Sequence, residues 1–229
     1  HHHVPCLDCH SCRHRAFAQC ATYKRTGITA GFEPAGGGYA EYVRVMKFVL
    51  PGVVKIPARN TFAEGAMLEP VNTVLKAVKR LNLLPGDRVL VAGQGPIGLM
   101  FTKILQLRGI RVFATDLLKS RLKLARQFGA RWTLDVSGSG RKSAHVSSLK
   151  ESQSRFTSAA TIRDFDAAII AVPSDAAATR ALALVRGGGQ VLLFAHTKRG
   201  TAFNMDPAMV CVDEKDLIGS YSSDFTLQK

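Results

Sequence analysis

The spacing of apolar residues in the C-terminal two thirds of the chain predicts strands that alternate with helices. Apolar runs too short for a helix predict strands at 88–92, 111–116, 131–134, 165–172, 191–195 and 216–221. Helical periodicity predicts helices at 96–108, 118–128 and 175–185, with Gly129 and the Gly187–Gly189 run as stops. Strands that alternate with helices form a doubly wound parallel sheet, so the predicted fold class is α/β.

The N-terminal part has a different pattern. Alternation predicts a half-buried strand at 38–45, and a second short β segment is expected at 53–57. A capping-box pattern from Thr61 to Glu64 predicts the start of a helix. Residues 1–69 are therefore expected to be mainly β and not to form a domain of their own.

A bend is expected around Pro70, which should kink or break the helix begun at Thr61. A second helical run is predicted from Val71 to Leu81, with Glu69 held at the bend. Residues 70–229 account for the α/β domain, including one loose helix near 147–158.

The stretch after the first predicted strand of this domain has the spacing of a phosphate-binding turn. Gly93 permits a sharp turn, Gly95 leaves room for a pyrophosphate, and Gly98 permits close packing of the following helix. Pro96 and Ile97 open that helix, whose free N–H groups and positive end favour anions. These residues predict a dinucleotide site.

An acidic residue ends the second strand of the same unit. Asp116 lies where a carboxylate can accept hydrogen bonds from both ribose hydroxyls of an adenosine. A carboxylate would also repel a 2′-phosphate, which favours NAD over NADP. Lys119 and Arg121 follow closely, and cations at this place sometimes host a phosphate.

Composition excludes some classes of function. The chain has 229 residues, 46% of them hydrophobic, and a formal net charge of +14. Its basic residues are spread over the polar faces of predicted helices, which favours a solvated surface over a nucleic-acid interface. There is no long apolar run and no signal-peptide pattern, so we expect a cytoplasmic protein without a membrane partner.

Four of the five cysteines lie within the first twenty residues, as Cys6, Cys9, Cys12 and Cys20. Two-residue spacers let neighbouring thiolates converge on one ion, and the longer gap lets a fourth return. Disulfides between cysteines this close are disfavoured, and the last spacing departs from that of bacterial iron–sulfur proteins. The pattern favours a closed structural zinc lobe.

The cysteine lobe, the strand at 38–45, the bend at Glu69 and the nucleotide turn occur in an order that resembles the zinc-dependent medium-chain dehydrogenases. The resemblance covers nearly the whole chain and is closest to the polyol dehydrogenase branch. It implies a Rossmann domain beside a partial, mainly β catalytic domain that carries the structural zinc.

The resemblance also implies roles for particular residues. Taken alone, Glu69 is an ordinary helix carboxylate, but it matches the position of a residue at the catalytic zinc, bound directly or through water. Thr73 matches a position that lines the nicotinamide pocket. Asp116 and Arg121 match the pair that holds the adenosine ribose.

The implied activity is hydride transfer between a secondary alcohol or polyol and NAD, in a homo-oligomeric enzyme, a dimer or tetramer. The other catalytic zinc ligands of this family precede the cysteine lobe and have no counterpart here. The sequence is therefore expected to be a fragment, and an incomplete protein that binds NAD and zinc is the alternative. A basic zinc-lobe protein that binds nucleic acid is a third hypothesis, which leaves the nucleotide turn unexplained.

Overall fold

The computed structural model describes residues 4–25, 40–45, 47–140, 163–195, 200 and 205–227. The chain divides into two compact units. Unit 1 comprises His1–Lys76 and Tyr221–Lys229, and unit 2 comprises Ala77–Ser220. The division therefore falls inside a helix, after Lys76, and differs from the sequence-based division into 1–69 and 70–229.

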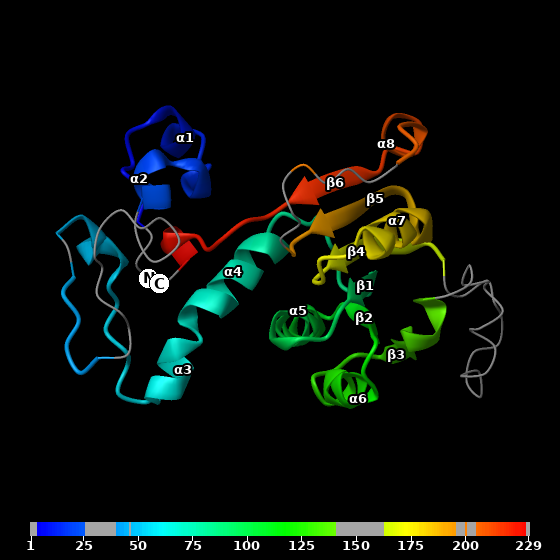
Figure 1. Cartoon of the computed structure of the whole chain (residues 1–229), viewed down its shortest axis with the longest axis horizontal. Helices are drawn as coiled ribbons and strands as arrows, with labels where there is room; N and C mark the ends of the chain where they lie inside the picture. The colour runs from blue at the N-terminus through cyan, green and yellow to red at the C-terminus, as the bar shows by residue number, and fades with distance from the viewer. Residues whose placement is uncertain are drawn as a thin grey trace. The chain divides into compact units, whose positions relative to one another are not determined.

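Unit 2 is built around a six-stranded sheet (Figure 1). Its strands are β1 (Arg88–Ala92), β2 (Arg111–Asp116), β3 (Trp132–Asp135), β4 (Phe165–Ile170), β5 (Val185–Leu193) and β6 (Asp216–Gly219). Its helices are α5 (Pro96–Leu107), α6 (Lys119–Gln127), α7 (Asp175–Leu184) and α8 (Ala208–Cys211), with a 3-10 turn, η3 (Ser137–Gly140).

All neighbouring strands of this sheet pair in parallel, in the order β3-β2-β1-β4-β5-β6. The chain moves outward from β1 to β3 and then returns to β4 on the other side of β1. This is the order of a doubly wound nucleotide-binding sheet, which binds its ligand where the strand order reverses. The predicted α/β class is confirmed.

The core of unit 2 lies on both faces of the sheet. α5 and α6 lie on one side of the strands and α7 on the other (Figure 1). On the α7 side, Leu90, Phe113 and Phe165 pack into one buried cluster. Because side chains alternate along a strand, Val89 and Val91 face the opposite layer, and both are fully buried. This two-sided burial explains why the strands appear in the sequence as continuous apolar runs.

Unit 1 contains short helices and turns. These are α1 (His10–Arg13), η1 (Phe17–Gln19), α2 (Ala21–Arg25), η2 (Lys47–Gly52), α3 (Phe62–Ala66), α4 (Leu68–Val78), which continues past Lys76, and η6 (Phe225–Leu227). A small buried cluster joins Cys12, Phe17, Ala18, Cys20 and Tyr23.

The capping box at the start of α3 is confirmed. The Thr61 hydroxyl accepts from the Glu64 N–H, and the Glu64 carboxylate accepts from the Thr61 N–H at 2.7 Å. The break expected near Pro70 occurs at Met67, between α3 and α4. Pro70 lies in the first turn of α4, where its missing N–H removes no intrahelical bond. Glu69 is therefore a first-turn residue of α4.

The prediction of two β segments in unit 1 is wrong for the residues that the structure describes. Residues 40–45 and 53–57 are irregular, and Tyr42 is 92% exposed. A strand requires a hydrogen-bonded neighbour, and β1 to β6 pair only among themselves. Residues 38 and 39 and the helix expected at 147–158 lie outside the described residues.

The Gly187–Gly189 run does not end a helix as predicted. α7 ends at Leu184, and the run lies within β5, where the register with β4 is irregular. Gly188 has a φ of +66° and donates its N–H to the Asp213 carbonyl at 2.8 Å. A Cβ at Gly189 would collide with the side chain of Val185. The glycines therefore permit a bulge in the strand.

No helix in the described part of the chain is long and apolar enough to span a membrane.

Candidate functional site

The turn after β1 is held in shape by two glycines that no other residue could replace. Gly93 has a φ of +91° and donates its N–H to the Thr115 carbonyl at 2.8 Å, which ties the turn to β2. A Cβ at Gly98 would collide with the carbonyl oxygen of Gly93. The first turn of α5 is therefore packed directly against the backbone of the turn, as the motif predicts.

Gly95 has a different role from its two neighbours. It is the N-cap of α5, has an ordinary φ of −68°, and its missing Cβ would meet no atom within 4 Å. Pro96 begins the helix and Ile97 is half-buried in the same turn. Open space around Gly95 thus lies at the N-terminus of a twelve-residue helix, whose first N–H groups have no intrahelical partner, an arrangement that fits a phosphate.

The carboxylate of Asp116 joins this turn to the end of β2. One oxygen accepts from the Gln94 N–H at 2.7 Å and the other from the Leu118 N–H at 2.9 Å. Arg121 lies 3.7 Å from the same carboxylate, whose side chain is only 4% exposed. A carboxylate has about four acceptor positions, so two remain for a ligand such as a ribose.

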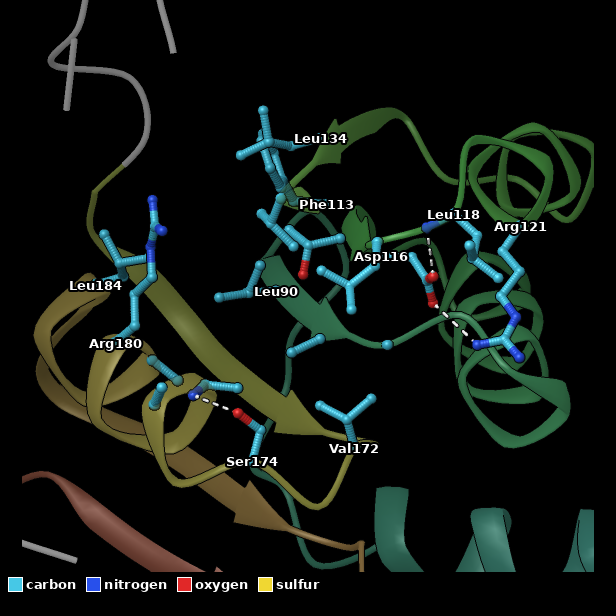
Figure 2. A pocket seen from close by; sticks show the side chains of 18 of the residues that line it. Leu90, Phe113, Asp116, Leu118, Arg121, Leu134, Val172, Ser174, Arg180 and Leu184 are labelled. Atoms are coloured by element: carbon cyan, nitrogen blue, oxygen red, sulfur yellow. Dashed lines mark hydrogen bonds and ion pairs between the residues drawn. The ribbon is translucent and has the colours of Figure 1, made fainter. Parts of the chain in front are cut away.

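A cavity of about 630 Å³ opens beside Asp116. Figure 2 shows Asp116, Arg121 and Leu118 on one side of it, and Ser174, Val172 and Arg180 on the other. The lining also includes Gly93, Thr115, Leu90, Phe113, Leu134, Val136, Phe165 and Leu184. Its mainly apolar walls and few polar groups are typical of a small-molecule site.

Sequence reasoning missed Gln94, which stands between the first two glycines of the motif. Its side chain is fully buried, donates to the Val91 carbonyl at 3.2 Å and accepts from the Thr102 hydroxyl at 2.9 Å. Gln94 therefore locks the turn from inside while its N–H holds Asp116. The sequence signal that could have identified Gln94 is a polar residue between two glycines, just after an apolar strand.

Glu69 and Thr73 lie one helical turn apart on α4 and contact each other. The Thr73 hydroxyl lies 2.9 Å from a Glu69 carboxylate oxygen and 3.0 Å from its carbonyl. Glu69 is exposed and Thr73 is half-buried. Their proposed catalytic roles stay predictions, because in the described residues no second group of metal-ligating side chains gathers around Glu69.

The same helix holds the returning C-terminal segment of unit 1. The Asn72 side chain exchanges two hydrogen bonds with the backbone of Asp224, at 2.8 and 2.9 Å, and Lys76 donates to the Tyr221 carbonyl. The Tyr23 hydroxyl lies 2.6 Å from that of Ser222. Burial raises the pKa of Tyr23, so it stays protonated and able to donate.

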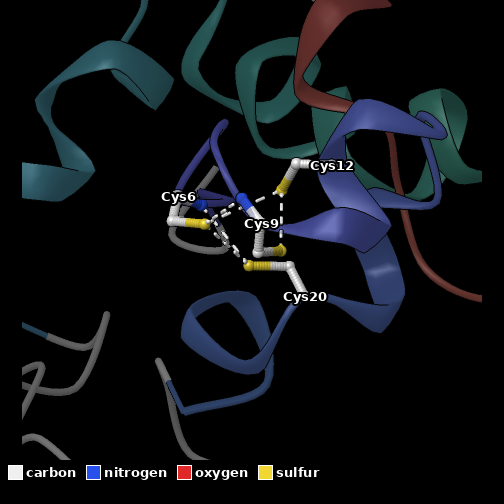
Figure 3. Close-up of side chains that lie close together, drawn as sticks. All are labelled: Cys6, Cys9, Cys12 and Cys20. Carbon is white, nitrogen blue, oxygen red and sulfur yellow. Dashed lines mark hydrogen bonds between the residues drawn. The ribbon is translucent and has the colours of Figure 1, made fainter.

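The four N-terminal cysteines converge at one point (Figure 3). The Sγ–Sγ distances are 3.6 Å for Cys9–Cys12, 3.7 Å for Cys6–Cys20 and 3.9 Å for Cys6–Cys12. A zinc ion with four thiolates at about 2.3 Å requires sulfurs about 3.8 Å apart, so the residues fit this metal. The four occupy every position of a tetrahedron, which is the arrangement of a structural site.

The protein surroundings favour thiolates at part of this cluster. Burial raises the pKa of the Cys20 thiol, but N–H groups including that of Cys6, 3.4 Å from its sulfur, outweigh burial and lower the pKa to about 6. Backbone N–H groups also lower the pKa of Cys6. Burial instead raises the pKa of Cys12 to about 12, so a bound cation is needed to deprotonate it at neutral pH.

The chain is similar to known zinc-binding dehydrogenases. The family model described as zinc-binding dehydrogenase matches residues 96–228. The chain is 27% identical over 230 residues to the D-xylulose reductase A of Aspergillus niger, with 98% of the chain and 59% of that protein covered. The chain thus spans about three fifths of this relative.

Two solved structures share the fold. A protein described as a zinc-binding dehydrogenase from Sinorhizobium meliloti, bound to NADP, matches with a TM-score of 0.79 and 22% identity, covering 97% of this chain and 60% of that one. An alcohol dehydrogenase from Escherichia coli, complexed with NADH, matches with a TM-score of 0.77 and 22% identity, covering 98% and 61%.

The glycines of the turn should separate folding from ligand binding. Gly95→Ala places a methyl group in open space, so we expect an unchanged Tm and a loss of NADH binding, measured by fluorescence titration. Gly98→Ala forces a collision with the Gly93 carbonyl, so both Tm and binding should fall. Normal NADH affinity of Gly95→Ala would contradict the phosphate-binding role.

The cysteine lobe should bind about one zinc ion per chain. Cys20→Ser should abolish this zinc and lower Tm, because unpaired thiolates near one another repel and the lobe has only a small core. Cys211→Ser is the control, since Cys211 is exposed and lies outside the cluster. Metal content measured by emission spectrometry checks the result, and equal zinc in both variants would contradict it.

Proposed function

The chain belongs to the zinc-binding dehydrogenase family, and on this premise we propose that the protein transfers hydride between a secondary alcohol or polyol and NAD. The family membership rests on more than half of the chain. The polyol substrate class is supported by the similarity to a xylulose reductase and by the sequence resemblance.

The arrangement around Asp116 carries the cofactor part of the proposal. Its carboxylate is anchored by the N–H groups of Gln94 and Leu118, so it cannot turn away from the cavity. The Asp116 carboxylate thus holds the turn after β1 in place and is itself the proposed ribose acceptor, at the same edge of the sheet. An adenosine ribose at Asp116 would place the following phosphates at Gly95 and the start of α5.

NAD is the preferred cofactor in this proposal. A 2′-phosphate would approach a buried carboxylate, which repels it, and Arg121 is already paired with that carboxylate. One structural relative holds NADP and another NADH, so the fold accepts both. The choice therefore depends on the residues at the end of β2.

The chemistry of the proposed reaction comes from two bound groups. A bound nicotinamide would accept or donate the hydride, and a catalytic zinc would supply the Lewis acidity that lowers the pKa of the alcohol. The protein's own contribution at α4 is the hydrogen bond between Thr73 and Glu69, which fixes the orientation of the carboxylate. We propose that Glu69 acts at this metal, directly or through water.

A second candidate is a protein that binds NAD and structural zinc without turnover. The four-cysteine group is the only metal-ligating cluster among the described residues, and it fits a closed site. Zinc content and turnover separate the candidates: about one zinc per chain without activity favours this one, and two with activity favours the enzyme. The cytoplasmic location and the homo-oligomeric state stay predictions.

Cofactor preference should change when the charge at Asp116 is removed. Asp116→Asn keeps an acceptor for a backbone N–H but loses the repulsion of a 2′-phosphate, so the ratio of NADP to NAD affinity should rise about tenfold or more. Asp87→Asn is the matched control, because Asp87 also accepts a backbone N–H but precedes β1 at the other edge of the sheet. An unchanged ratio in Asp116→Asn would count against the NAD assignment.

The activity itself is tested by following NADH formation with a panel of secondary alcohols and polyols. Glu69→Gln should lower kcat about 10- to 100-fold, as expected for a group at a catalytic metal. Glu64→Gln, an exposed carboxylate of α3, is the control and should leave kcat unchanged. Normal turnover of Glu69→Gln would remove Glu69 from the mechanism.

A further inference from the structure

We propose that the edge of the sheet opposite the candidate cofactor site docks on an anionic lipid bilayer, through exposed arginine and leucine side chains. This basic edge comprises Leu84, Arg88, Leu107, Arg108, Arg111 and Arg131. It is separate from the proposed dehydrogenase site, because it lies at the amino ends of the parallel strands and the turn with Asp116 lies at their carboxyl ends.

The parallel sheet brings together arginines that are distant in the sequence. Arg88 and Arg111 are the first residues of β1 and β2, and Arg131 directly precedes β3. Arg88 is the register partner of Arg111, and Arg131 donates its N–H to the Val112 carbonyl at 2.9 Å. Three successive strands therefore place a cation at the same edge.

Two loops at this edge carry exposed leucines. Leu84 precedes β1 and Leu107 is the last residue of α5, and they are 70% and 69% exposed. The Gly86 N–H donates to the Gly109 carbonyl at 2.9 Å, so the two loops lie side by side. Arg108, the C-cap of α5, directly follows Leu107. Large apolar side chains thus stand among the arginines.

The arginines of the basic edge keep their charge available. In the described residues, no carboxylate lies within ion-pair distance of Arg108, Arg111 or Arg131. The Arg131 guanidinium lies 4.9 Å from the ring centre of Trp132, a contact that holds the side chain without neutralising it.

The carboxylates at the same strand ends do not cancel this charge. Asp87 accepts a backbone N–H at 2.8 Å, and Asp166 is paired with Arg186 at 2.8 Å. Asp164 is exposed before β4 and has Arg163, also exposed, next to it in the sequence. The edge is therefore positive at neutral pH.

The combination of arginines with exposed leucines favours a lipid surface over other polyanions. Guanidinium groups bind the phosphates of lipids and of nucleic acids alike. A nucleic-acid backbone offers the leucines no apolar region, whereas a bilayer offers its acyl chains just below the anionic headgroups. The same edge of a second copy of this chain would carry the same charge and be repelled.

A surface contact of this kind leaves no long apolar run in the sequence, because its leucines come from separate loops. The expectation of a protein without a membrane partner rests on the lack of such a run, so it does not apply to this edge. Docking here would leave the opposite edge, with Asp116, open to a cofactor.

The experiment measures co-sedimentation of the full chain with phosphatidylcholine vesicles that contain or lack phosphatidylserine. We expect binding only to vesicles with phosphatidylserine, and weaker binding as salt rises. Arg108→Gln/Arg111→Gln should weaken binding about tenfold or more, because both charges adjoin the anionic surface. Lys119→Gln/Lys123→Gln is the matched control, since it removes the same charge from α6, which begins at the opposite edge, and should bind as the wild type does.

The leucines are tested by their contact with acyl chains. Leu84→Gln/Leu107→Gln should weaken binding about tenfold, because neither side chain can then be buried in lipid. Leu107→Trp should show fluorescence quenched by lipids that carry bromine on their acyl chains, with the wild type, whose one tryptophan is Trp132, as background. All substituted positions are exposed, so the Tm of each variant should equal that of the wild type.

Three outcomes would overturn the inference. A wild-type protein that stays free of phosphatidylserine vesicles at low salt has no such surface, and equal losses in both charge variants indicate diffuse attraction by net charge. Unchanged vesicle binding of Leu84→Gln/Leu107→Gln, or no quenching of Leu107→Trp, removes the apolar contact. Retention on single-stranded DNA that Arg108→Gln/Arg111→Gln loses would then assign the edge to nucleic acid.

Discussion

The carboxylate of Asp116 is the interaction on which the proposed nucleotide site depends. It accepts from the backbone of the turn after β1 and from the backbone that leads into α6, so one side chain joins two successive strand-to-helix connections. The close approach of Gly98 to the Gly93 carbonyl fixes the same turn from the other side. The geometry of the turn, where we propose that phosphates bind, is therefore set by the protein before any ligand binds.

Unit 1 depends on a different kind of constraint. The described part of its N-terminal lobe buries only a few apolar side chains, around Cys12, Phe17 and Tyr23. So small a core contributes little free energy of folding, and four thiolates on one ion can replace what it lacks. The Tyr23 hydroxyl hydrogen-bonds that of Ser222, and the Asn72 side chain hydrogen-bonds the backbone of Asp224. The cysteine lobe and α4 therefore both hold the C-terminal segment of unit 1.

The sequence predicted most of unit 2 because its signals are local and repeated. Glycine spacing, apolar runs and the acid at Asp116 each correspond to one physical requirement of the fold, and β1, α5 and β2 lie where these signals place them. The predictions failed where a segment with a strand-like pattern has no neighbouring strand to pair with. Residues 53–57 have a suitable composition for a strand, but no neighbouring strand pairs with them in the described structure. The Gly187–Gly189 run predicts a helix stop, although it serves a bulge in β5.

By itself, the sequence determined which chemistry is possible: four thiols with metal-ligand spacing, a turn without side chains, and a carboxylate at a strand end. These depend on residue type and spacing along a few residues, so they can be recognised without coordinates. Only the tertiary structure decided the partners, such as Gln94 with Asp116 and Thr73 with Glu69. Hydrogen bonding and burial are properties of surroundings that distant parts of the chain supply, and no local pattern records them.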